Sequence, residues 1–212
     1  MAGIRIDNAT DALVVVDVQN DFCPGGALAV PDGDAVVPVI NRLIGLFDHV
    51  VLTQDWHPEG HDSFASSHPG KNPLELITVA YGDQVLWPDH CVQGTAGADF
   101  HAGLDATKAE MVIRKGYRRE IDSYSAFYEN DQTTPTGLAG SLKERGFKRL
   151  FFTGLATDFC VGWSALDARK EGFDAVLVDD ACRAIDFNGS LDAAHAAFKE
   201  NGVAVVTSAD IS

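Results

Sequence analysis

The sequence has little of what marks a membrane, secreted or nucleic-acid-binding protein. No apolar run approaches the roughly 20 residues that cross a bilayer. Residues 1–12 lack the basic-then-apolar order of a signal peptide. Only 16 lysines and arginines stand against 31 aspartates and glutamates, and this net charge of −15 opposes binding to nucleic acid or to an anionic membrane. We therefore expect a cytoplasmic protein whose partner is a small molecule.

Cysteine is also scarce, with four in 212 residues. The four are widely spaced and none forms a CxxC pair, so neither a disulfide framework nor a cysteine-based zinc site is indicated. We expect free thiols at Cys23, Cys91, Cys160 and Cys182.

The remaining composition is that of a globular protein, with 46% hydrophobic and 22% charged residues. The length suits one domain spanning 1–212, which can bury about 70% of the surface of its unfolded chain. Short β-branched or aromatic runs predict buried strands at 13–18, 49–53, 111–114, 149–153, 175–178 and 203–206. Apolar periodicity predicts helices at 34–47, 136–145, 161–170 and 191–200, the last three followed by Gly146, Gly172 and Gly202.

Continuous apolar strands that alternate with helices are typical of parallel sheets covered on both faces. The sequence therefore predicts a three-layer α/β/α fold with a mostly parallel six-stranded sheet. A long stretch at about 55–100 is irregular, rich in Gly, Pro, His and Asp, and connections of this length are usually functional. Ligands of such folds bind beyond the carboxyl ends of the strands, so residues at those ends are the first candidates for a functional site.

An acid, a base and a thiol follow three of the predicted strands. Cys160 begins a predicted helix that Thr157 or Asp158 could cap, and a helix N-terminus lowers the pKa of a thiol. Lys115 and Asp17 end apolar runs, where the ammonium could stabilise the carboxylate and a thiolate. Each residue also has an ordinary interpretation: a small buried thiol, a solvated lysine and a turn-capping aspartate.

Metal-ligating side chains follow the second predicted strand. Asp55 and His57 stand at i and i+2, on one side of an extended segment. Aspartate and histidine suit Zn²⁺, Mn²⁺ or Fe²⁺, but a third ligand is needed. The candidates are His61, His68, His90 and His101, among which His90 lies in the rigid turn Trp87-Pro88-Asp89-His90-Cys91. Solvated histidines in an acidic surface loop are the alternative.

Five motifs together resemble the nicotinamidase/pyrazinamidase group of the isochorismatase-like hydrolases. They occur in the family's order and extend over nearly the whole chain, and Trp-Pro-Asp-His-Cys points to nicotinamidases within the superfamily. The motifs are DVQNDFCPGGALAV from Asp17, TQDWHP from Thr53, WPDHCVQGT from Trp87, Lys115-Gly116, and GLATDFCV from Gly154.

The resemblance implies specific roles for residues of this chain. It implies a catalytic triad of Asp17, Lys115 and Cys160, and a metal held by Asp55, His57 and His90. Some members use a further ligand, for which His61 is the nearest candidate, although its spacing from His57 is shorter than in those members. It implies a cis peptide bond before Ala156 and an oxyanion hole formed by the backbone amides of Ala156 and Cys160. Aromatic pocket walls are implied at Phe22, Trp87 and Tyr124, each of which could equally be core packing.

The implied activity is hydrolysis of nicotinamide, and also of pyrazinamide, through a cysteine thioester, in NAD salvage. One divalent ion is implied, with Zn²⁺ favoured and Fe²⁺ or Mn²⁺ as alternatives. Another amidase or an isochorismatase is the competing enzymatic hypothesis, and isochorismatases need no Asp-Trp-His metal site. A non-catalytic binding module is the competing hypothesis from another class. The sequence does not decide between a monomer and a homo-oligomer, because no apolar stripe stands out in it.

Overall fold

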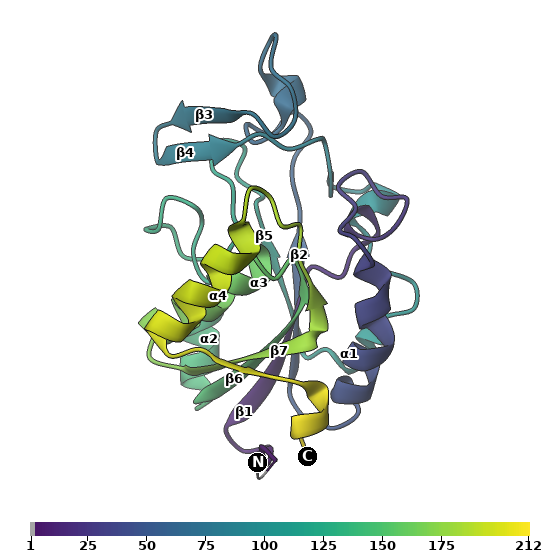
Figure 1. The fold of residues 1–212 in the computed structure, drawn as a ribbon, viewed down its shortest axis with the longest axis vertical. Coiled ribbons are helices and arrows are strands. Elements are labelled where there is room, and N and C mark those ends of the chain that lie inside the picture. The colour runs from purple at the N-terminus through teal and green to yellow at the C-terminus, as the bar shows by residue number, and fades with distance from the viewer. Residues whose placement is uncertain (1–2) are drawn as a thin grey trace.

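The computed structural model describes residues 3–212, so residues 1 and 2 of the expected domain lie outside the described residues. A six-stranded sheet in the order β5-β2-β1-β6-β7-β8 forms its centre (Figure 1), and every neighbouring pair runs parallel. This confirms the predicted sheet. Its strands are β1 (Asp11–Val16), β2 (Val50–Asp55), β5 (Met111–Lys115), β6 (Arg149–Leu155), β7 (Asp174–Arg183) and β8 (Ala204–Val206).

The central strands are buried on both faces, because their side chains alternate between two apolar clusters. All six residues of β1 are buried. Leu13 and Val15 pack in the cluster that includes the helix α1 (Val37–Ile44), whereas Val14 and Val16 pack with residues of the other helices. The continuous apolar runs of the sequence reflect this burial on two sides.

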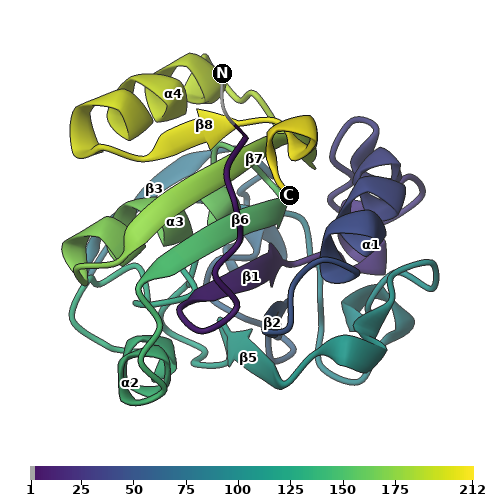
Figure 2. The same cartoon turned by 90° about the horizontal axis from the view of Figure 1, so that it is seen from below.

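Helices cover both faces of the sheet (Figure 2). The helix α1 lies on one side, and α2 (Leu138–Glu144), α3 (Cys160–Lys170) and α4 (Ser190–Asn201) lie on the other. The predicted helix 34–47 is shorter than expected, because Gly33–Val36 forms a 3₁₀ turn and Pro38 stands in the first turn of α1. Gly146, Gly172 and Gly202 adopt the left-handed conformation expected just beyond a helix.

The stretch expected to be irregular contains regular structure. Strands β3 (Leu76–Val79) and β4 (Gly82–Val85) form an antiparallel hairpin that stands above the central sheet in Figure 1. The hairpin was missed because Leu76 on β3 is exposed and Gln84 on β4 is buried, which removes the usual alternation of apolar and polar residues. β7 extends beyond 175–178 because Asp179 and Asp180 end the apolar run but not the strand.

The topology brings four strand ends together. After β1 the chain adds β2 and then β5 on one side, and it returns to place β6 on the other side of β1. The carboxyl ends of these strands therefore share one edge of the sheet, at the position where α/β folds bind ligands. Among residues 3–212, no helix has the length and apolar character needed to span a membrane.

Candidate active site

Lys115, at the end of β5, is the centre of a buried polar cluster. Its Nζ atom lies 2.7 Å from Oδ2 of Asp17, 3.0 Å from Oδ1 of Asp55 and 3.4 Å from Sγ of Cys160. The ammonium also donates to the carbonyl of Ser123 at 2.9 Å. Burial alone lowers the pKa of Lys115, but the nearby carboxylates of Asp17 and Asp55, and the thiol of Cys160 when it is ionised, raise it well above its ordinary value. The lysine is thus a cation held among groups that can carry negative charge.

Asp17 follows β1 and is buried completely. Its backbone is left-handed, with φ of 48°, which is unfavourable for a residue other than glycine. The Thr53 hydroxyl donates to Asp17 Oδ1 at 2.6 Å, and the Asp17 amide donates to the same hydroxyl oxygen at 3.2 Å. Burial raises the pKa of Asp17, despite the opposing effect of Lys115. A carboxylate with a raised pKa is a stronger base than usual, as proton transfer from a thiol requires.

Cys160 is the first residue of α3, as expected, and is 8% exposed. The expectation that the helix N-terminus lowers the pKa of Cys160 is wrong. Burial raises the pKa of Cys160 well above its usual value, against the lowering effect of Lys115 and with a further increase from Asp17 and Asp55. The helix N-terminus does not offset the loss of solvation, so the thiol needs a base to ionise it.

The turn before Cys160 has the backbone geometry that the resemblance implied. The Leu155–Ala156 peptide bond is cis. Within residues 3–212, neither the Ala156 amide nor the Cys160 amide donates to a backbone or side-chain acceptor, so both can bind an external oxygen atom. The expected capping role of Asp158 is wrong: Phe159 is the N-cap and no side chain caps the helix, because the Asp158 carboxylate is bonded elsewhere.

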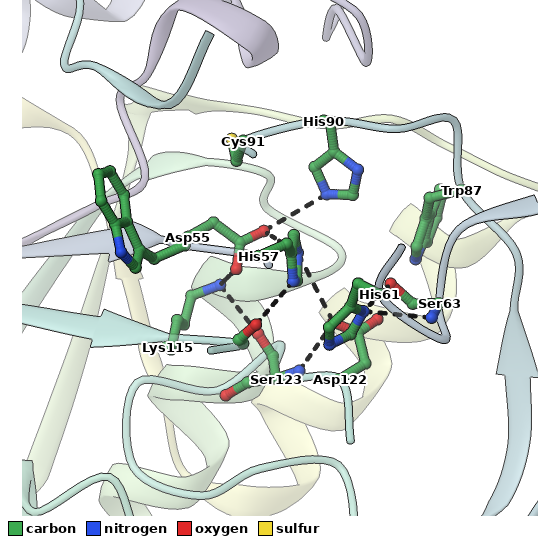
Figure 3. Close-up of polar contacts among 12 residues, drawn as sticks. Asp55, His57, His61, Ser63, Trp87, His90, Cys91, Lys115, Asp122 and Ser123 are labelled. Carbon is green, nitrogen blue, oxygen red and sulfur yellow. Dashed lines mark hydrogen bonds and ion pairs between the residues drawn. The ribbon is translucent and has the colours of Figure 1, made fainter. Parts of the chain in front are cut away.

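Asp55, His57 and His90 converge as a candidate metal group. Figure 3 shows both imidazoles directed toward the Asp55 carboxylate, whose Oδ2 lies 3.0 Å from His57 Nε2 and 3.4 Å from His90 Nε2. The Nδ1 atoms face the carbonyls of Gly116 at 2.9 Å and Pro88 at 2.8 Å. A carbonyl only accepts, so each Nδ1 carries the proton and each Nε2 is oriented toward the carboxylate. This donor set and orientation fit a divalent ion such as Zn²⁺.

The other histidines are held in different contacts. His61 is buried beside His57, but its Nε2 faces the Arg118 carbonyl at 2.8 Å and its Nδ1 faces the Ser63 hydroxyl at 2.8 Å. A second group of metal-ligating types, His57, His61 and Asp122, therefore has one member whose two nitrogens are already bonded. Candidates His68 and His101 bond to Asp62 and Gly103 respectively, so the structure brings neither to Asp55.

A pocket opens next to Cys160, and the three expected aromatic residues line it. Trp87 and Tyr124 stand edge to face with their ring centroids 6.3 Å apart, and Phe159 packs against both, at 5.1 Å from Trp87 and 5.5 Å from Tyr124. These walls suit a small planar ligand. The residues that line the pocket are Phe22, Leu28, Asp55, Trp87, His90, Asp122, Tyr124, Ala156, Phe159, Cys160 and Ile185.

Several pocket and supporting residues were missed from the sequence. Gln84 of β4 is 1% exposed, and its Nε2 donates to Asp122 Oδ2 at 2.9 Å and to the Tyr124 hydroxyl at 3.1 Å. Trp87 Nε1 donates to the same hydroxyl at 3.1 Å. Gln84 thus joins the hairpin to two pocket walls. No local pattern marks such a residue, since its partners come from distant parts of the chain.

Comparison with known proteins identifies the family of this chain. A family model described as the isochorismatase domain matches residues 11–210. A nicotinamidase from Acinetobacter baylyi is 53% identical over 212 residues, which cover 100% of this chain and 99% of that protein.

Three solved structures share the fold over nearly the whole chain. A nicotinamidase/pyrazinamidase from Acinetobacter baumanii is 56% identical with a TM-score of 0.94, covering 95% of this chain and 98% of its own. An L. infantum protein in complex with nicotinate is 42% identical with a TM-score of 0.87, and the match covers 99% of this chain and 98% of that protein. A Pyrococcus horikoshii pyrazinamidase in complex with zinc is 38% identical with a TM-score of 0.76, and the match covers 93% of this chain and 98% of that protein. The chain therefore belongs to the nicotinamidase/pyrazinamidase group of the isochorismatase family.

Proposed function

We propose that this protein hydrolyses nicotinamide to nicotinate and ammonia through a thioester on Cys160. The observation that carries the proposal is the position of Lys115, whose ammonium contacts Asp17 at 2.7 Å and Cys160 at 3.4 Å beside an aromatic pocket. The names of the related nicotinamidases support nicotinamide as the substrate. Pyrazinamide, a similar planar amide, is proposed as a second substrate on the same grounds.

In the first half of the reaction Asp17 accepts the thiol proton and the sulfur attacks the amide carbon. A carbon–sulfur bond forms, and the amides of Ala156 and Cys160 stabilise the negative oxygen. Losing one donor of this kind typically costs a factor of about 10²–10³ in rate. The carbon–nitrogen bond then breaks as Asp17 returns the proton to the departing ammonia. Lys115 stays positive throughout and stabilises whichever of Asp17 and Cys160 carries the negative charge.

In the second half Asp17 takes a proton from water, and the resulting hydroxide attacks the thioester carbon. The carbon–sulfur bond breaks and Asp17 returns its proton to the Cys160 sulfur. Nicotinic acid leaves and releases its own proton to solvent, which gives nicotinate. Phe22, Trp87 and Tyr124 enclose the ring and limit the access of bulk water.

We propose that Asp55, His57 and His90 hold one divalent ion, with Zn²⁺ first and Fe²⁺ or Mn²⁺ as alternatives. Support comes from the donor set, the buried Nε2 atoms and the zinc complex of a related pyrazinamidase. When bound, the ion supplies a Lewis acid for water and for the ring nitrogen of the substrate. His61 is not proposed as a ligand, because both its nitrogens have other partners.

One domain would suffice for the reaction, since the proposed residues all lie at one edge of one sheet. We place the reaction in NAD salvage on the strength of the family. A cytoplasmic location is proposed because a reducing compartment keeps the Cys160 thiol free.

The test is ammonia release from nicotinamide by purified protein, with Cys160→Ala and Cys182→Ala compared. Cys182 is a buried thiol outside the pocket, so its variant serves as the matched control. Turnover should vanish in Cys160→Ala and persist in Cys182→Ala. A strong chelator should abolish turnover, and adding Zn²⁺, Fe²⁺ or Mn²⁺ separately should show which ion restores it.

Two outcomes would contradict the proposal. Turnover in Cys160→Ala would exclude the thioester. No release from metal-loaded wild type would favour another amidase or a binding module, which a panel of small amides would distinguish.

A further inference from the structure

The carboxylate of Asp158 accepts hydrogen bonds from the segment that follows β7. Asp158 is 6% exposed and lies two residues before Cys160. Its Oδ1 accepts the amide of Ile185 at 3.0 Å, and its Oδ2 accepts the amide of Asp186 at 2.7 Å and the hydroxyl of Ser190. A carboxylate offers only acceptors, which matches three converging donors.

The loop at 184–189, between β7 and α4, needs such a partner. Asp186 and Asn188 both have φ of 53°, a left-handed conformation that is uncommon outside glycine. The only backbone bond that ties the turn of Asp158 to the end of β7 within residues 3–212 is that from the Thr157 amide to the Arg183 carbonyl at 2.9 Å. The Asp158 carboxylate therefore supplies most of the polar contacts that hold this loop on the turn.

Ile185 links the Asp158 contacts to the ligand pocket. Its side chain lines the pocket together with Ala156 and Cys160. The turn 156–160 thus carries the candidate nucleophile and both candidate oxyanion amides, and through Asp158 it also holds one apolar wall of the pocket. Asp158 thus connects the turn that carries the Cys160 sulfur to the loop that carries this wall, in addition to the Thr157–Arg183 backbone bond and the packing of Ile185 against the core.

We propose that Asp158 is a positioning residue that holds Ile185 against the ring of the substrate and so determines how tightly the ring binds. This inference rests on the proposed function, and it concerns affinity and not the bond-making steps. Contacts to the ring are the same before and during attack on the amide, so their loss raises KM and leaves kcat nearly unchanged.

The test compares steady-state kinetics of metal-loaded variants with nicotinamide. Asp158→Asn replaces one acceptor oxygen by a donor and should raise KM about tenfold, with kcat changed by less than about threefold. Ser190→Ala is the matched control, because it removes one donor to the same carboxylate and leaves the amide bonds of Ile185 and Asp186 intact. Its KM should stay near that of the wild type.

A second variant separates positioning from general stability. Ile185→Ala removes the wall directly and should raise KM by a similar factor, even where Asp158→Asn folds too poorly to measure. In the combined variant the two effects should not multiply, since both remove the same contact.

The outcomes distinguish this inference from the proposed function. A wild type that hydrolyses nicotinamide, combined with an unchanged KM in Asp158→Asn or Ile185→Ala, overturns the positioning role alone. A fall in kcat at constant KM, or multiplicative effects in the combined variant, overturns it as well. A wild type that neither binds nor hydrolyses nicotinamide overturns the proposed function, and this inference with it.

Discussion

Lys115 and Asp17 form an ion pair with 2.7 Å between Nζ and Oδ2, in which neither side chain is exposed to solvent. The pair lies at the ends of β5 and β1, two strands that are separated in the sheet by β2. Removing two charges from water costs several kcal/mol each, so the pair is stable only because each charge has its partner. A catalytic role for these residues and their contribution to stability are therefore linked.

Lys115→Met should lower the free energy of unfolding by about 3–5 kcal/mol, because it leaves buried carboxylates without their cation. Urea unfolding followed by circular dichroism measures the change. Lys71→Met is the matched control: its partner Glu75 lies 3.1 Å away, but both side chains are about 40% exposed, so the change should stay below about 1 kcal/mol.

The double variant Asp17→Asn, Lys115→Met gives the decisive comparison for this pair. Removing both charges should restore part of the stability that Lys115→Met loses, while turnover stays absent. A double variant less stable than Lys115→Met would show that the loss arises from packing and not from the uncompensated charge.

Asp131 provides a prediction about acid stability outside the pocket. Its slight burial raises its pKa, but hydrogen bonds from Thr134 and Thr133 lower the pKa from 3.8 to about 2. Because the pKa of Asp131 is lower in the folded protein than in the unfolded chain, its carboxylate stabilises the fold at pH values above about 4. This stabilisation is lost as the pH falls from about 4 to about 2. Asp131→Ala should therefore cost about 1 kcal/mol at pH 7, a small amount because the group is solvated.

Urea unfolding of the wild type and Asp131→Ala at pH 7, 4 and 3 measures this dependence. The difference in unfolding free energy should narrow steadily toward low pH. Asp48→Ala, a change at an exposed carboxylate, is the control for the loss of one surface charge. If the difference in unfolding free energy between wild type and Asp131→Ala were the same at all three pH values, the loss of stability would be steric and not linked to protonation of Asp131.

The fold was predictable because its signals are local. Apolar runs mark β1 and β2 on their own, and Gly172 marks the end of α3 without reference to the rest of the chain. Parallel strands then bring Asp17, Asp55 and Lys115 to one edge of the sheet, so their proximity followed from topology alone.

What could not be predicted depends on tertiary contacts. The pKa of Cys160 is raised by burial that no helix pattern reveals. Asp158 fits a helix cap by its sequence position, yet its carboxylate faces amides about 27 residues further along the chain. Gln84 lies in a weakly patterned hairpin, and its burial results from Asp122 and Tyr124 on another loop.

Gln84→Leu should raise KM for nicotinamide about tenfold, because it removes the donor that orients the Tyr124 wall. It also leaves Asp122 Oδ2 without the Gln84 donor, a loss of about 1–3 kcal/mol in stability. Steady-state kinetics and urea unfolding measure the two effects. Gln93→Leu is the control: its exposed amide donates to the Trp56 carbonyl at 2.9 Å, so stability should fall by about 1 kcal/mol or less and KM should not change. An unchanged KM in Gln84→Leu would remove the hairpin from the pocket's function.

Gly116, directly after Lys115, should strengthen metal binding. A Cβ atom there would lie 2.5 Å from His57 Cε1 and 3.0 Å from Asp55 Oδ1, and the residue has φ of +65°. The glycine lets the backbone approach closely enough for its carbonyl to accept from His57 Nδ1. Gly116→Ala must displace the His57 imidazole and weaken metal affinity. We expect a loss of about 10–100-fold, which is typical when a metal-ligating histidine loses the hydrogen bond that orients it.

Equilibrium dialysis against Zn²⁺ with elemental analysis measures that affinity without reference to turnover. Gly94→Ala is the matched control, since Gly94 has a similar φ of +77° but no atom within 4 Å of an added Cβ. Both substitutions impose the same left-handed strain on alanine, so only the contact with His57 differs between them. Wild-type zinc affinity in Gly116→Ala would show that His57 does not hold the ion, and the metal group would then need another third member.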